Sequence, residues 1–82
     1  MKHAGTEALD RLEPLLSKLR AIPELREKQR GIFYKGSRAF LHFHDDPLGL
    51  FADVRFDSEF ERFNVTSAHE QRRFLERVRA SV

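Results

Sequence analysis

The sequence contains no cysteine, and this absence excludes several kinds of chemistry. Without a thiol the chain cannot form a disulfide, bind zinc through thiolates or attack a substrate with a cysteine nucleophile. It also lacks any apolar run approaching the roughly 18 residues of a transmembrane helix, and segment 1–5 lacks the apolar core of a signal peptide. We therefore expect a bacterial-type cytoplasmic protein with no membrane partner.

The common catalytic motifs are also missing. Ser37, Ser58 and Ser67 fall in expected turns or helix caps, and none has the Gly-x-Ser-x-Gly setting of a hydrolase nucleophile. There is no phosphate loop, no dinucleotide-binding fingerprint and no His-Glu-x-x-His motif. The Asp-Asp-Pro sequence of segment 45–47 is typical of a turn. The sequence therefore predicts that the protein is not an enzyme and needs no cofactor.

The chain is long enough for one small hydrophobic core. Its 82 residues are 40% hydrophobic and include eight phenylalanines, whose large side chains can dominate such a core. No internal repeat, low-complexity segment or Gly/Ser-rich linker divides the sequence. We therefore predict a single domain over residues 1–82, in which the polar segment 1–5 is frayed.

Charge is distributed unevenly along the chain. The net charge of +2 is too small to indicate nucleic-acid binding by itself. However, segment 18–38 has seven basic and two acidic residues, whereas segment 45–61 has six acidic residues and one arginine. Segments of opposite sign are predicted to attract each other, either within the fold or across a dimer interface.

Two amphipathic helices are predicted, one near each end of the chain. The first covers residues 6–21, with Thr6 as its N-cap, and ends before Pro23. Its apolar stripe consists of Leu9, Leu12, Leu16 and Leu19. Pro14 lies on the face opposite this stripe, so we expect one kinked helix; a break just before Pro14 is the alternative.

The second helix covers residues 68–80. Ser67 and Glu70 have the spacing of a capping box, which marks the start of the helix. Its apolar stripe consists of Phe74, Leu75, Val78 and Val82.

Between the helices the apolar residues alternate, which is typical of strands. The sequence predicts strands over 32–34, 38–44 and 50–56, separated by turns around Gly36 and over 45–49.

Two segments are ambiguous. Segment 59–65 is either a fourth strand or a short helix; we favour the strand, although Phe60 is out of phase and would need a bulge. Segment 23–30 is either a turn followed by a strand or one helical turn closed by Gly31. The predicted fold is α+β: an antiparallel sheet of three or four strands in a meander, with both helices packed on one face.

The most distinctive motif is His42-Phe43-His44. Residues two apart on a strand point to the same face, so the histidines should lie together while Leu41 and Phe43 enter the core. The same alternation gives the residues expected on the uncovered sheet face: Phe40, His42, His44, Phe51, Asp53 and Arg55. An exposed face with several aromatic rings favours a binding module that contacts a second copy of itself or another protein.

Two other functions remain open for this face. Two imidazoles and a carboxylate can bind a divalent metal, and the ligands would be His42, His44 and Asp53. Aromatic side chains mixed with arginines can bind nucleic acid, here through residues such as Phe51 and Arg55. The neighbouring acidic residues would repel phosphate, which argues against nucleic acid as a partner.

Segment 31–46, Gly-Ile-Phe-Tyr-Lys-Gly-Ser-Arg-Ala-Phe-Leu-His-Phe-His-Asp-Asp, together with segment 50–55, resembles small bacterial domains of unknown function. In those domains, which include the YjbR-like and luciferase-type groups, a helix precedes a glycine-containing hairpin and a histidine-rich second strand. The similarity covers about half of the chain. It implies an α+β fold and transfers no catalytic residue.

Overall fold

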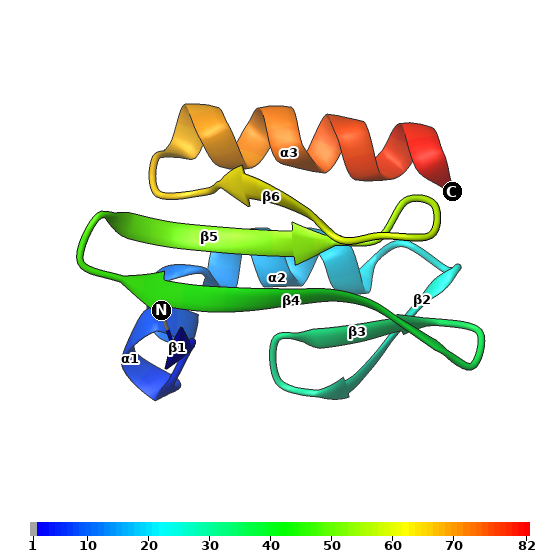
Figure 1. Cartoon of the computed structure of the whole chain (residues 1–82), viewed down its shortest axis with the longest axis horizontal. Coiled ribbons are helices and arrows are strands. Elements are labelled where there is room, and N and C mark those ends of the chain that lie inside the picture. Colours follow the sequence, from blue (N-terminus) through cyan, green and yellow to red (C-terminus); the bar gives the residue numbers. More distant parts are fainter. Residues whose placement is uncertain (1) are drawn as a thin grey trace.

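The computed structural model describes residues 2–82, which form one sheet with helices packed against it (Figure 1). In chain order the elements are β1 (Lys2–His3), α1 (Thr6–Arg11), α2 (Glu13–Arg20), β2 (Leu25–Gln29), β3 (Ile32–Lys35), β4 (Arg38–Asp46), β5 (Gly49–Val54), β6 (Glu61–Asn64) and α3 (Ala68–Ser81). The predicted α+β class and antiparallel sheet are confirmed, but the described residues form more strands than expected and three helices rather than two. None of these three helices is long and apolar enough to cross a membrane.

Strands β2 to β6 follow one another across the sheet in chain order, so the main path is the predicted meander. β1 is added at the edge of β4 that β3 leaves uncovered, because β3 pairs with residues 38–41 and β1 with residues 44–45. The Ala4 amide extends this contact by donating to the Phe43 carbonyl at 3.1 Å. Residues 2–4, expected from the sequence to fray, are thus hydrogen-bonded to the sheet.

The N-terminal helical segment is divided in two, as in the alternative that Pro14 suggested. Leu12, at φ −91° and ψ −1°, separates α1 from α2. Pro14 then falls in the first turn of α2, where a missing backbone N–H leaves no hydrogen bond unmade. The single kinked helix is therefore wrong, and Gly5 rather than Thr6 is the N-cap of α1.

The core lies between the helices and one face of the sheet. In Figure 1, α2 lies behind β4 and β5 while α3 runs along β6. The predicted leucine stripe is buried, and the sheet faces it with Phe33, Leu41, Phe43, Leu50, Ala52 and Val54. The capping box of α3 forms as predicted, and Phe74, Leu75 and Val78 enter the core. Val82 is 36% exposed, so its assignment to the stripe is wrong because the helix has already ended.

Both ambiguous segments contain strands. Residues 25–29 form β2, which turns into β3 through Gly31 at φ +80°. A Cβ on Gly31 would lie 2.6 Å from Leu9 Cδ2, so the positive φ favours glycine here and any larger residue would also displace the Leu9 side chain. Residues 61–64 form β6, and Phe60 precedes this strand, so its phase needs no bulge.

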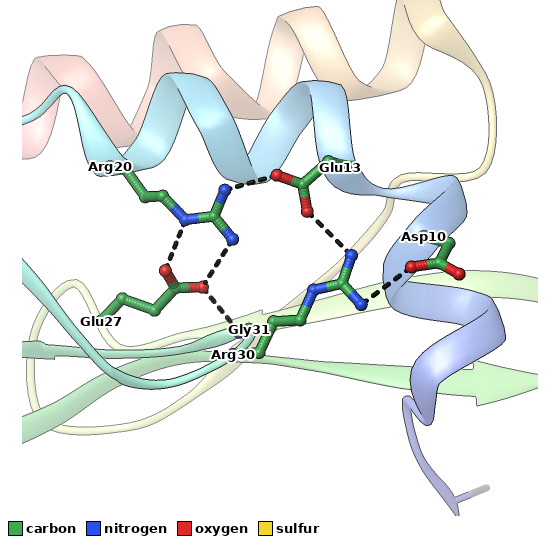
Figure 2. Close-up of polar contacts among 6 residues, drawn as sticks. All are labelled: Asp10, Glu13, Arg20, Glu27, Arg30 and Gly31. Atoms are coloured by element: carbon green, nitrogen blue, oxygen red, sulfur yellow. Dashed lines mark hydrogen bonds and ion pairs between the residues drawn. The ribbon is translucent and has the colours of Figure 1, made fainter.

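An ion-pair network, the helix-side network, joins α1 and α2 to the turn between β2 and β3 (Figure 2). It consists of Asp10, Glu13, Arg20, Glu27 and Arg30. Arg20 bridges the two glutamates, and Arg30 reaches a carboxylate on each helix at 2.9 Å. The Glu27 carboxylate also accepts from the Gly31 amide at 2.8 Å. The helices are thereby fastened to one end of the sheet.

These contacts change the ionisation of both glutamates. Hydrogen bonds from Arg20 and then from Arg30 lower the pKa of Glu13 from 4.5 to about 2. Burial alone would raise the pKa of Glu27, but hydrogen bonds from Arg20 and the Gly31 amide outweigh burial and lower it.

The two oppositely charged segments do not pair with each other. The ion pairs of segment 18–38 go to Asp10 and Glu13 on the helices and to Glu27 within the segment itself. Asp53 of segment 45–61 pairs instead with Arg62. No ion pair within residues 2–82 joins the two segments; the ion pairs that form use nearer partners on adjacent elements.

Candidate functional site

The sheet face opposite the helices carries the histidines. Residues that pair directly across antiparallel strands share a face, so the register defines two rows of side chains. One row contains His3, His44, Phe51 and Asn64, and the next contains His42, Asp53 and Arg62. The rows bring β1, β4, β5 and β6 together at one place, which we call the histidine face.

Asp53 is the hub of this face and is only 7% exposed. Arg62 Nε and Nη2 donate to its two carboxylate oxygens at 2.7 and 2.8 Å. His44 Nε2 lies 3.0 Å from Oδ2, and His42 Nε2 lies 3.6 Å from the same oxygen. The hydrogen bond from Arg62 outweighs burial and lowers the pKa of Asp53. The carboxylate is therefore charged, and both of its oxygens already have donors.

Three imidazole rings gather beside Asp53. The ring centres of His42 and His44 are 5.0 Å apart, and that of His3 lies 4.9 Å from His44 and 5.6 Å from His42. Burial, and then the neighbouring His44, lower the pKa of His42. The His42 ring is therefore neutral at pH 7 and has a lone pair to offer.

His44 uses only one of its two ring nitrogens. The contact with Asp53 places a proton on Nε2, and in that neutral tautomer the lone pair is on Nδ1. That atom is buried and has no hydrogen-bond partner, the one such side-chain atom in the described part of the chain. Because buried polar atoms are nearly always paired, this nitrogen is the candidate on the face to bind a ligand atom.

The ring spacing resembles the spacing that a tetrahedral metal imposes. Zinc–nitrogen bonds of about 2.0–2.1 Å put each ring centre about 3.2 Å from the ion, and tetrahedral angles then separate the ring centres by about 5 Å. The observed separations run from 4.9 to 5.6 Å. One donor atom each from His42, His44 and Asp53 also lies within 4.8 Å of the others. His3 lies outside this donor group and approaches it only through its ring, whose centre is 4.9 Å from that of His44.

The structure brings together most of the residues expected on this face. His42, His44 and Asp53 lie side by side, and Phe51 pairs directly with His44. Arg55 lies at the rim, where its guanidinium donates to the Ala39 carbonyl at 2.6 Å.

Phe40 is not on the histidine face, which corrects the sequence prediction. It is 3% exposed and belongs to the core, like its neighbour Leu41. The pairing of β3 with β4 shifts here: Phe33 pairs with Leu41 and Tyr34 with Ala39, so Phe40 is an extra residue. Such a bulge breaks the alternation and turns two consecutive side chains to the same side.

Three residues of the face escaped the sequence analysis. The sequence pattern could have identified Arg62. Side chains alternate along a strand, so if Phe63 faces the core, Arg62 lies on the outer side of β6, opposite Asp53. Phe60 packs its ring 5.1 Å from that of His42 and under the Arg55 guanidinium at 4.8 Å. His3 had no usable signal, because a two-residue strand is set by its partner rather than by its own pattern.

Comparisons of the chain with protein-family models, with curated proteins and with solved structures gave no match, so the site stands on its geometry alone.

Proposed function

We propose that this protein is a binding module for a divalent transition metal of the zinc class, held by the imidazoles of His3, His42 and His44. The observation that carries the proposal is the unpartnered, buried Nδ1 of His44 within a group of three imidazoles at metal-like spacing. Zinc is the favoured ion because neutral imidazoles are its common ligands in proteins.

Asp53 acts outside the ligand shell in this proposal. Both of its oxygens are occupied, by Arg62 and by His44 Nε2. A carboxylate that holds one nitrogen of a histidine fixes the ring and makes the other nitrogen a better ligand. His44 would therefore bind through Nδ1, and the Arg62 charge would stay neutralised by Asp53 rather than repel the ion.

Three imidazoles leave one coordination position for water or for a group from a ligand. The role we propose is binding and involves no catalytic step. It agrees with the expectation of a non-enzymatic protein and with the sequence alternative that assigns metal or small-ligand binding to His42 and His44.

Calorimetric titration with zinc tests this function. The protein is expected to bind one ion per chain, and His42→Ala and His44→Ala should each weaken binding by more than about a hundredfold, the upper range for loss of an outer-shell partner. His69→Ala is the matched control, because His69 is exposed at the start of α3 and should leave zinc binding unchanged. Equal zinc affinity in the three variants would contradict the proposal.

Self-association through the histidine face is the second candidate. Phe60, 41% exposed, lies at the rim of this face under the Arg55 guanidinium, and aromatic and arginine side chains are common anchors of interfaces. Sedimentation at micromolar concentration should then show a dimer that Phe60→Ser weakens. Leu48→Ser is the control, since Leu48 is 85% exposed in the turn between β4 and β5. A monomer at these concentrations would argue against this candidate.

A further inference from the structure

A second surface, which meets the rim of the histidine face at Arg55, has two hollows. The first, of about 310 Å³, is lined by Phe63, Asn64, Glu70, Arg73, Phe74 and Arg77. The second, of about 270 Å³, is lined by Lys35, Arg38, Ala39, Phe40, Arg55, Phe56 and Asp57.

The two hollows adjoin each other. The Arg77 guanidinium, from the first hollow, lies 4.5 Å above the ring centre of Phe56, from the second. Phe56 in turn packs edge-on against Phe63 of the first hollow, with ring centres 6.0 Å apart. We call the combined surface the α3 furrow; it runs from β6 along α3 to the turn between β3 and β4.

The α3 furrow is strongly basic for a protein with a net charge of +2. Its lining has five cationic side chains, namely Lys35, Arg38, Arg55, Arg73 and Arg77, and two carboxylates, Asp57 and Glu70. The Glu70 carboxylate is occupied by the Ser67 amide at 2.9 Å in the capping box. Among the described residues, none of the five cations forms an ion pair, although other arginines of this chain do.

Aromatic side chains form the floor between these cations. Phe56 and Phe63 are partly exposed, and their rings lie between the cations of the two hollows. Two of the cations are held in place, because Arg55 donates to the Ala39 carbonyl at 2.6 Å and Lys35 Nζ reaches the Ser81 carbonyl at 3.5 Å. Cations beside partly exposed rings suit a chain that repeats a phosphate and a flat base.

We infer that the α3 furrow binds single-stranded nucleic acid. The phosphates would lie on Arg73, Arg77 and Arg38, and bases would stack against the partly exposed phenylalanines. A free mononucleotide fits the observations less well, because the cations are spread over two joined hollows rather than gathered in one pocket. This surface shares no ligand residue with the proposed metal site.

Fluorescence anisotropy with a labelled oligothymidylate, in the presence of a chelator, tests the inference. We expect binding at low salt, with log affinity falling by about 0.7 per phosphate contact for each tenfold rise in salt. Arg73→Ala/Arg77→Ala and, separately, Arg38→Ala should each weaken binding by about tenfold or more. Arg79→Ala removes a cation from the same helix outside both hollows and should change affinity by less than about twofold.

Three results would overturn the inference. The first is no binding at low salt, and the second is that Arg79→Ala weakens binding as much as Arg73→Ala/Arg77→Ala. The third is displacement of the oligonucleotide by adenosine monophosphate at the same concentration, which would show a site for a free mononucleotide. The chelator keeps the test independent of the metal proposal, so either can fail alone.

Discussion

The helix-side network and the cluster around Asp53 both use charged side chains to join separate elements, but they differ in burial and in saturation. In the network, each guanidinium faces two carboxylates, and most of its side chains are 36–64% exposed. On the histidine face, the side chains of Asp53, His44 and His42 are only 10–23% exposed, and two imidazoles share one carboxylate that Arg62 already occupies.

This difference separates a structural cluster from a binding site. The network has a partner for every charge, so it has nothing to offer a ligand. On the histidine face, the buried Nδ1 of His44 has no hydrogen-bond partner among the described residues, so it can bind a ligand atom. Substitutions in the two clusters should therefore differ in their effects on stability.

Asp53→Asn should have the largest effect on stability. Breaking a buried ion pair costs about 3–5 kcal/mol, and the half-exposed Arg62 reduces the expected cost to about 2–3 kcal/mol. Urea unfolding of the variant measures this loss in the free energy of unfolding. Asp57→Asn is the matched control, since Asp57 is exposed and has no ion pair among the described residues; a similar cost for both variants would contradict the account.

Gly31→Ala should have the next largest effect, about 2 kcal/mol, because it puts a Cβ on a residue with φ +80° and brings that Cβ against Leu9, next to the helix-side network. Gly36→Ala isolates the first contribution: Gly36 has φ +63° and no atom within 4 Å of an added Cβ. It should cost about 1 kcal/mol. Thermal unfolding compares the two variants, and equal losses would show that α1 does not pack closely on the turn.

Arg30→Ala should have a small effect on stability, although it removes two ion pairs. Its partners Asp10 and Glu13 are 64% and 42% exposed, and exposed pairs contribute little. The free energy of unfolding of this variant, measured at low and high salt, should differ little from that of the unchanged protein. A loss as large as that of Asp53→Asn would remove the distinction between the two clusters.

Glu13 should give the smallest effect, visible only in acid. Its folded-state pKa of about 2 lies below the ordinary 4.5, so its stabilising contribution is complete above about pH 4.5 and is lost as the pH falls toward 2. When the pH is lowered from about 4.5 to about 2, the melting temperature of Glu13→Gln should therefore fall less than that of the unchanged protein. An identical acid dependence would show that the contacts with Arg20 and Arg30 do not persist in solution.

The sequence predicted those parts of the molecule in which local pattern and tertiary structure agree. The alternation over β4 and β5 correctly put His42, His44 and Asp53 on one face, and the leucine spacing identified the buried stripe of α1 and α2. The capping box correctly located the start of α3.

The sequence failed where a contact between distant residues decides the conformation. Phe40 follows the alternation of its own strand, but a bulge forced by pairing with β3 turns it into the core. His3 joins the other histidines because β4 extends beyond β3 and leaves an edge for β1. The partner of each charge depended on which elements become neighbours, which composition does not reveal.

The central claim is that the histidine face takes up a metal ion at the unpartnered nitrogen of His44. The most direct measurement is nitrogen-detected NMR of the imidazole rings during addition of zinc. We predict that the resonances of His3, His42 and His44 move, with Nδ1 of His44 among the nitrogens that shift, while His69 stays in place. Resonances of His42 and His44 that remain unmoved at millimolar zinc would contradict the claim.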